Sequence, residues 1–155
     1  MALYLVRHAV AVGRSAWHHA DEKRPLTPKG RRQAAALLRL FEGVEVRRIL
    51  SSPAVRCRDT VVPLAEAYKL EVHDAVELAE GHGPRKAMEL FGETAAKKGD
   101  SVLCAHGDLI PEVLRRLARN GVRLESDLHY AKGSTWELAV DDGRIVSGRY
   151  HPPAE

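Results

Sequence analysis

Short apolar runs along the chain alternate with longer segments in which apolar residues recur every three or four positions. The runs are typical of strands buried on both faces, and the longer segments are typical of amphipathic helices. This order predicts an α/β fold: a three-layer α/β/α sandwich with a mainly parallel central sheet and a C-terminal antiparallel hairpin. Strands are expected at residues 3–6, 46–50, 71–73, 101–105, 135–140 and 144–148, and helices over 28–41 and after residues 53, 83 and 108.

Local signals mark the ends of several of these elements. Thr27 before Pro28 is typical of a helix N-cap followed by the first helical position. The Ser51-Ser52-Pro53 turn offers a serine as N-cap to the next helix, in which Pro63 predicts a kink or another irregularity. Asp142-Gly143 suits a two-residue hairpin turn. The segments 74–83 and 122–132 are predicted to be loops, and the tail 151–155 is predicted to be frayed.

The first strand ends in two residues with distinct chemistry, Arg7 and His8. In an open α/β sheet, ligands bind at the carboxyl ends of the strands. A guanidinium fork matches phosphate oxygens, and an imidazole can serve as nucleophile, base or metal ligand. Arg56 follows the second long strand through the serine-proline turn, and His106 follows the strand 101–105. If these strands are neighbours, the four cationic or titratable groups converge, and a phosphoryl dianion between them offsets their mutual repulsion.

Size and composition restrict the class of protein. A chain of 155 residues, 45% of them hydrophobic, suits one globular domain over residues 1–155. The net charge of +3 is a mild basic excess, and scattered arginines with few aromatic residues do not indicate nucleic-acid binding. No apolar run approaches the ~20 residues of a membrane span, and Arg7 interrupts the run in which a signal peptide would lie.

The two cysteines, Cys57 and Cys104, show neither a CxxC motif nor the spacing of a secreted disulfide framework. A reducing cytoplasm therefore fits the chain best. Oligomeric state stays open at this level, because Trp17 and Trp136 suit either a core or an interface between subunits.

Four short motifs carry a resemblance to a known family. Residues 5–9 resemble the Arg-His-Gly signature of the histidine phosphatase (phosphoglycerate-mutase-like) superfamily, and residues 51–60 resemble its second arginine motif. Ala105-His106-Gly107 resembles the second-histidine motif, and Gly133-Ser134 resembles the short motif before a late strand. The small size is similar to that of the SixA-like phosphohistidine phosphatase branch. Three segments are also similar to the phosphatase domain fused to some actinobacterial Nudix hydrolases: residues 55–57, 104–107 and 132–136.

The resemblance implies a phosphatase without metal or other cofactor, in which His8 attacks phosphorus and becomes phosphohistidine. It also implies that Arg7, Arg56 and His106 neutralise charge on the phosphate oxygens, an electrostatic contribution that dominates phosphoryl transfer. A helix that begins after His106 and Gly107 adds free backbone N–H groups to this phosphate site. The implied partner is an anionic phosphorylated substrate, and no membrane is expected to take part.

The resemblance also points to a proton donor for the leaving oxygen. The acid of the family commonly lies in a Leu-x-Glu segment, which residues 78–80 match, so Glu80 is the first candidate and Glu77 the second. For a phosphoramidate such as phosphohistidine a weak or absent acid is tolerable, because the leaving nitrogen can be protonated before attack. Ala9 stands where the family often has glycine, a substitution that SixA-like members share.

Several alternatives stay open. A protein that binds a phospho-ligand without turnover would keep the same pocket, and the substrate could be a phosphohistidine protein, a nucleotide or a sugar phosphate. A metallohydrolase is disfavoured because no HxH or HxxxH pair with a carboxylate is evident. The alternative for Arg56 is an ion pair with Asp59, and for His106 a bond to a backbone carbonyl. Residues interpreted as solvated are Arg14, His18, His19, His82 and His129.

Overall fold

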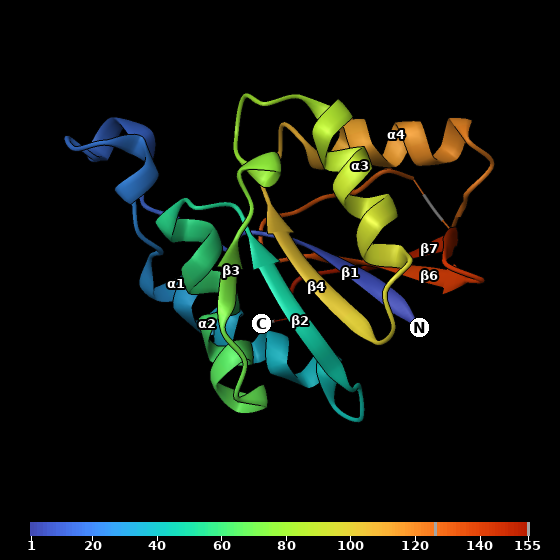
Figure 1. Cartoon of the computed structure of the whole chain (residues 1–155). Coiled ribbons are helices and arrows are strands. Elements are labelled where there is room, and N and C mark those ends of the chain that lie inside the picture. Colours follow the sequence, from blue (N-terminus) through green and yellow to red (C-terminus); the bar gives the residue numbers. More distant parts are fainter. Residues whose placement is uncertain (126, 155) are drawn as a thin grey trace.

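A mixed sheet forms the centre of the protein, whose computed structural model describes residues 1–125 and 127–154 (Figure 1). Its strands are β1 (Ala2–Arg7), β2 (Val46–Ser51), β3 (Val72–Asp74), β4 (Asp100–Ala105), β5 (Arg123–Leu124), β6 (Thr135–Asp141) and β7 (Arg144–His151). Within the described residues they run in the order β3-β2-β4-β1-β6-β7-β5. The first four neighbours are parallel, whereas β6 is antiparallel to both β1 and β7. The predicted mainly parallel sheet with a C-terminal hairpin is confirmed.

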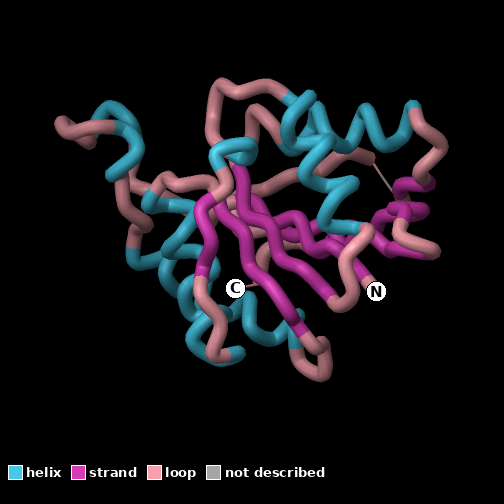
Figure 2. Tube along the Cα trace, viewed as in Figure 1, coloured by secondary structure: helices cyan, strands magenta, loops and turns pink. Residues whose placement is uncertain are grey.

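Helices cover both faces of this sheet, as Figure 2 shows in cyan on either side of the magenta strands. The helices are α1 (Pro28–Ala36), η3 (Leu37–Phe41), α2 (Val55–Tyr68), α3 (Pro84–Ala95) and α4 (Ile110–Arg119). One buried cluster joins η3 and α2 to the sheet, another joins α3 and α4 to its opposite face, and a small third cluster joins Ala34 of α1 to Ala9 and Leu26. The predicted three layers are therefore present. An arm that carries the short helices η1 (Arg14–Ala16) and η2 (Asp21–Lys23) projects from this body (Figure 1).

Strand β1 is buried on both faces, as its run of apolar residues predicts. Successive side chains of a strand point to opposite faces, so Leu3 and Leu5 enter the cluster with α3 and α4. Tyr4 and Val6 enter the cluster with η3 and α2. Trp136 on β6 is 1% exposed and belongs to the core rather than to a free surface.

The predicted helix over residues 28–41 is confirmed as α1 followed by the tighter turns of η3. The Thr27 hydroxyl caps it by accepting a 3.0 Å hydrogen bond from the backbone N–H of Gly30. Helix α2 continues through Pro63, so the proline does not divide the helix. At the hairpin turn, Asp142 and Gly143 have φ angles of 50° and 72°, and the predicted two-residue turn is confirmed.

Three local predictions are wrong. No serine is the N-cap of α2: Ala54 holds that position, and the Ser52 hydroxyl lies 2.8 Å from the His106 ring instead. The expected loops 74–83 and 122–132 contain η4 (Val76–Leu78) and β5, respectively. The tail is ordered at His151, which ends β7 opposite Thr135, whereas Glu155 lies outside the described residues. Tertiary pairing, which local sequence does not encode, decides β5 and the end of β7.

The sheet order brings three strand ends to one edge. Strand β4 lies between β1 and β2, with Arg7 opposite Ala105 and Ser51 opposite Cys104. The residues that follow these strands therefore leave the sheet side by side. This is the arrangement in which the candidate site residues meet.

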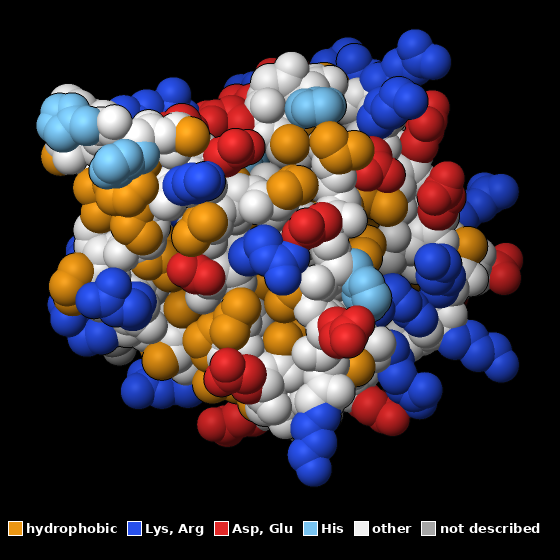
Figure 3. Space-filling view, turned by 60° about the vertical axis from the view of Figure 1, so that its left-hand side comes forward, with side chains coloured by type: hydrophobic (Ala, Val, Ile, Leu, Met, Phe, Trp, Pro, Cys, Tyr) orange, Lys and Arg blue, Asp and Glu red, His pale blue; other side chains and the backbone are white. Residues whose placement is uncertain are grey.

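The surface carries both signs of charge. Figure 3 shows acidic and basic side chains interspersed over the face that it presents, between patches of apolar side chains. Among the described residues, no helix is both long enough and apolar enough to cross a membrane.

Two glycines give opposite predictions for the same substitution. A Cβ at Gly30 in α1 would lie 2.0 Å from the carbonyl oxygen of Val10, whereas a Cβ at Gly92 in α3 would meet nothing within 4 Å. We expect Gly30→Ala to lower the free energy of unfolding by roughly 2 kcal/mol or more through this clash. Gly92→Ala should raise it by up to about 1 kcal/mol through helix propensity. Urea denaturation measures both, and equal effects of the two substitutions would contradict the packing described.

Candidate active site

His8 follows β1 and lies with its ring buried at the edge of the sheet. Its Nδ1 lies 2.8 Å from the carbonyl oxygen of Ala9. Because a carbonyl only accepts, Nδ1 must carry the proton, which leaves Nε2 with a free lone pair in the neutral ring. Burial is the main cause that lowers the pKa of His8 to about 3. The hydrogen bond to Ala9 raises this pKa, whereas electrostatic repulsion from His106, Arg56 and Arg7 lowers it further. The imidazole is therefore neutral at physiological pH and available as a nucleophile.

Thr60 in α2 fixes the backbone beside His8. Its hydroxyl accepts a 2.9 Å hydrogen bond from the N–H of Ala9 and donates one of 2.7 Å to the carbonyl oxygen of Arg56. One side chain thus ties the loop of His8 to the helical turn of Arg56. This contact explains why threonine stands at the end of the second arginine motif.

Arg7 leans across Gly107. Its Nη1 donates a 2.7 Å hydrogen bond to the carbonyl oxygen of Tyr130, and its guanidinium carbon lies 5.5 Å from the centre of the Tyr130 ring. A Cβ at Gly107 would lie 2.5 Å from Nη2 of Arg7, so only glycine permits this close approach. The Nε of Arg7 is buried and has no hydrogen-bond partner among the described residues. This donor therefore has no acceptor within the described part of the protein.

Arg56 is 1% exposed in the first part of α2. Its Nη1 donates to the backbone oxygen of Asp21 at 2.9 Å, and its Nη2 donates to Asp21 Oδ2 at 3.1 Å and to Glu80 Oε2 at 2.9 Å. The sequence offered Asp59 as an ion-pair partner for Arg56. The structure instead pairs Arg56 with Asp21 and Glu80. As in Arg7, the Nε of Arg56 is buried and unpartnered among the described residues.

His106 follows β4 and faces His8, with 5.5 Å between the ring centres. Its Nε2 lies 2.8 Å from the Ser52 hydroxyl and 3.5 Å from the Cys57 sulfur. The ring is therefore held by side chains of the serine-proline turn and of α2, and not by a backbone carbonyl. Cys57 is buried on α2, as its position on the helix predicts.

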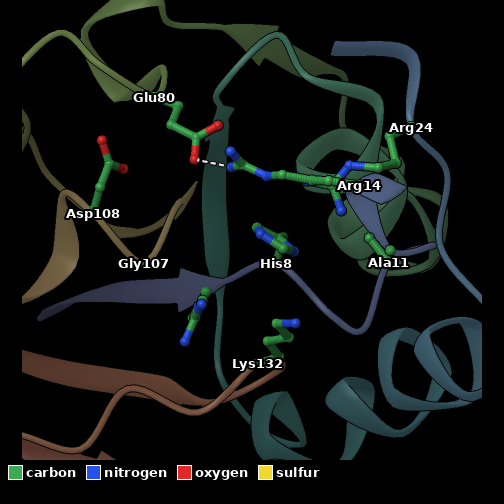
Figure 4. A pocket seen from close by; sticks show the side chains of 10 residues that line it. His8, Ala11, Arg14, Arg24, Glu80, Gly107, Asp108 and Lys132 are labelled. Atoms are coloured by element: carbon green, nitrogen blue, oxygen red, sulfur yellow. Dashed lines mark hydrogen bonds and ion pairs between the residues drawn. The ribbon is translucent and has the colours of Figure 1, made fainter. Parts of the chain in front are cut away.

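Two cavities adjoin these residues, and Glu80 lines both of them. The first, of about 330 Å³, is lined by Arg7, His8, Gly107 and seven further residues. In Figure 4, Glu80 lies on one side of His8 in this cavity and Lys132 on the other. The second cavity, of about 360 Å³, is lined by Arg56, His106 and nine further residues, Glu80 among them. Glu77 lines neither cavity. Position alone therefore separates the two candidate acids.

Several residues of the site carry no signal in the sequence. Arg14, interpreted as solvated, forms a 2.5 Å ion pair with Glu80 while its side chain stays 65% exposed. Arg24 is buried and donates to Asp21 Oδ1 at 3.0 Å and to the carbonyl oxygen of Val12 at 2.7 Å. These residues belong to an arm without regular periodicity, so only the folded chain places them at the site. Further lining residues of the first cavity are Ala11, Gly13, Asp108 and Lys132.

Carboxylates compensate for part of the positive charge of the site. Asp21 faces Arg24, Arg56 and Arg14; burial raises the pKa of its carboxyl, but the hydrogen bond from Arg24 and the three positive charges outweigh this and lower it. Among the described residues, no three His, Cys, Asp or Glu side chains are grouped so that they could hold a metal ion. The chemistry available at this edge is thus that of a neutral imidazole among guanidinium groups, beside a carboxylate.

Residues 3–90 match the sequence profile of the Histidine phosphatase superfamily (branch 1), and the chain belongs to this family. The resemblance inferred from the four motifs is thereby confirmed. The chain is 30% identical over 154 residues to a Mycolicibacterium smegmatis protein named 8-oxo-(d)GTP phosphatase; the match covers 97% of this chain and 48% of that protein. The chain therefore spans about half the length of this relative.

Solved structures share the fold. The protein histidine phosphatase SixA complexed with tungstate superposes with a TM-score of 0.78 at 18% identity, over 97% of this chain and 94% of that one. A putative phosphohistidine phosphatase SixA from Nakamurella multipartitia gives a TM-score of 0.76 at 23% identity, over 99% and 96% of the two chains. Family membership supports phosphatase activity, and these structures confirm the histidine phosphatase fold.

The contact between Arg7 and Gly107 predicts the effect of one methyl group. Gly107→Ala should push the Arg7 guanidinium away and lower kcat/KM for a phosphomonoester such as p-nitrophenyl phosphate by roughly 10- to 100-fold, the cost of one charge-assisted hydrogen bond. Gly13→Ala is the matched control, because a Cβ at Gly13 in the same cavity meets nothing within 4 Å. Steady-state kinetics measure both variants, and equal losses in the two would contradict this assignment.

The buried neutral ring of His8 predicts a loss of stability in acid. An unfolded histidine titrates near 6.5 and folded His8 at about 3, so the unfolded state binds more protons between these values. The free energy of unfolding should therefore fall as the pH is lowered from 6.5 toward 3. His8→Asn, which cannot titrate, should lose roughly 3 kcal/mol less than the wild type between about pH 7 and about pH 4. Parallel pH profiles from urea denaturation of the two proteins would contradict the burial of a neutral ring.

Proposed function

We propose that this chain is a phosphatase that hydrolyses a phosphomonoester or a phosphohistidine through a phosphohistidine intermediate on His8, without metal or other cofactor. The observation that carries the proposal is the state of His8: a buried neutral ring with Nδ1 bound to a carbonyl and Nε2 free. Two arginines beside it each keep a buried Nε donor without a partner among the described residues. A phosphoryl group would supply the missing acceptors.

The proposed reaction has two steps. Nε2 of His8 attacks phosphorus in line with the leaving oxygen, the P–N bond forms and the P–O bond breaks. Arg7, Arg56 and His106 then hold the phosphoryl oxygens with the backbone at Gly107. In the second step the oxygen of a water molecule bonds to phosphorus, the P–N bond breaks, and the Glu80 carboxylate accepts the proton of the water; this regenerates His8 and releases inorganic phosphate.

Glu80 is the proposed proton donor to the leaving oxygen: its carboxylate takes up the proton of a monoanionic phosphoryl group and passes it to that oxygen. It is supported over Glu77 because it lines the cavity of His8 and contacts Arg56 at 2.9 Å. A carboxyl group of this kind contributes about 10²- to 10⁴-fold when the leaving group is a poor one. A leaving nitrogen that is already protonated does not require it.

A nucleotide phosphate is a second candidate for the substrate. The relative that is 30% identical to this chain is named 8-oxo-(d)GTP phosphatase, although the chain spans only about half of it. A screen of nucleotides, sugar phosphates and a phosphohistidine protein, with His8→Ala as the blank, separates these classes. Release of phosphate from none of them, despite binding, would identify a non-catalytic binding protein instead.

We also propose that the protein acts in the cytoplasm. Cys57 and Cys104 are free and buried, which suits a reducing cytoplasm. The proposed partner is the phosphorylated substrate alone, with neither nucleic acid nor membrane.

The intermediate can be trapped. After brief mixing with ³²P-labelled substrate and a denaturing quench, the wild-type chain should carry label that is stable in alkali and lost in acid, as a phosphoramidate is. His8→Ala should carry none. Undiminished label in His8→Ala, or an acid-stable label, would assign the chemistry to another group.

The role of Glu80 depends on the leaving group. Glu80→Gln should lower kcat roughly 100-fold or more for an alkyl phosphate, because an alkoxide leaves poorly without a proton. It should change kcat for phosphohistidine by less than about tenfold. Glu77→Gln is the matched control and should affect neither substrate, so a larger loss in Glu77→Gln would exchange the two assignments.

A further inference from the structure

Glu80 stands between two guanidinium groups and between the two cavities. Its Oε1 accepts a 2.5 Å bond from Arg14, and its Oε2 accepts a 2.9 Å bond from Arg56. Both bonds are charge-assisted and therefore stronger than bonds between neutral groups. The carboxylate thus occupies a donor that the proposed function assigns to phosphate.

The carboxylates of Asp21 and Glu80 already occupy the N–H groups that Arg56 would need to bind a phosphoryl group with two parallel bonds. A guanidinium has five N–H groups, and it grips an oxyanion through two parallel ones. The parallel pairs are Nε with Nη2 and Nη1 with Nη2, so both of them use an N–H of Nη2. Nη2 has two hydrogens, and it contacts Asp21 Oδ2 and Glu80 Oε2. Arg56 can therefore bind a phosphoryl group bidentately only if one carboxylate leaves.

Glu80 is the carboxylate that can leave. Asp21 holds Arg56 through both its backbone oxygen and its side chain, and it also accepts from Arg24. Glu80 reaches Arg56 with one side-chain oxygen from an exposed position after η4. Release of Asp21 from Arg56 would break two bonds, one of them to the backbone of the arm, whereas release of Glu80 from Arg56 breaks one.

Arg14 is placed to keep Glu80 at the site after that release. It belongs to η1 of the arm, a segment without buried residues, and its side chain is 65% exposed. Its nearest other carboxylate, Asp21, lies 3.9 Å away and is engaged by Arg24 and Arg56. Figure 4 shows the bond between Arg14 and Glu80 next to His8.

We propose that Glu80 occupies the phosphoryl position on Arg56 in the free protein, that the substrate phosphoryl group displaces it, and that Arg14 is the positioning residue that then holds Glu80 beside the leaving oxygen. This inference rests on the proposed function for the role of Glu80 as acid. The exchange itself is a binding equilibrium. It therefore predicts that Glu80 competes with free phosphate.

Calorimetric titration with inorganic phosphate tests the exchange without turnover. Glu80→Gln should bind phosphate about tenfold more tightly than the wild type, because a neutral amide competes weakly for Arg56. Glu80→Ala is the second variant and should behave in the same way.

Asp108→Asn is the matched control for charge. Asp108 lines the same cavity, but its Oδ2 accepts from the N–H of Gly81 and it has no bond to Arg56. Asp108→Asn should raise the affinity for phosphate by no more than about twofold, because it removes only a screened surface charge. An equal gain in Asp108→Asn and Glu80→Gln, or no gain in either Glu80 variant, would overturn the exchange.

The positioning role of Arg14 is tested by kinetics. Arg14→Gln should lower kcat for an alkyl phosphate about tenfold and leave KM within about twofold, because it loses the group that orients Glu80 and not a phosphate ligand. Arg14→Lys should restore most of kcat, since an ammonium can hold one carboxylate oxygen. A rise in KM with kcat unchanged would make Arg14 a substrate ligand and overturn its positioning role.

The two kinds of failure are distinguishable. If no substrate is turned over but Glu80→Gln still gains affinity for phosphate, the exchange holds and the proposed function fails. If the wild type forms phospho-His8 and Glu80→Gln gains no affinity, the proposed function holds and the exchange fails.

Discussion

Burial of a positive charge at Arg56 is the constraint that organises the site. A guanidinium that is 1% exposed is costly unless carboxylates and hydrogen bonds compensate for its lost hydration. Asp21 and Glu80 supply this compensation from two segments that are distant in sequence, the arm and the loop after η4. One buried cation therefore links both segments to α2. In the proposed function the same guanidinium also binds the phosphoryl group, so its bonds to the carboxylates and its bonds to the ligand would compete for the same N–H donors.

The order of the strands in the sheet fixes where the residues of the site leave it. Because β4 lies between β1 and β2 in register, Arg7, His8 and His106 leave the same edge with little freedom of backbone position. Thr60 then connects the backbone of Ala9 to that of Arg56. Rigid strand ends and one bridging hydroxyl thus set the relative positions of His8 and the cations. The proposed phosphoryl transfer would require such fixed positions.

Sequence patterns predict the fold and the four central residues because these depend on periodic burial and on strand ends. They fail where tertiary contacts decide. The bond between Arg56 and Asp21 joins residues 35 positions apart, and the arm that carries Asp21 and Arg24 has no hydrophobic period to anticipate it. Ser52 illustrates the same limit: its position before a helix predicts an N-cap, but the proximity of His106 recruits its hydroxyl instead. Two-residue strand β5 exists only through its pairing with β7.

In the proposed function, Arg7, Arg56 and His106 jointly hold one oxyanion against the free Nε2 of His8. A crystal structure of the protein with bound inorganic phosphate tests it most directly. We expect phosphorus on the Nε2 side of His8, with phosphate oxygens within about 3.2 Å of donors on Arg7, Arg56 and His106. Phosphate bound away from His8, or beside His8 without contact to Arg56 or His106, would contradict it.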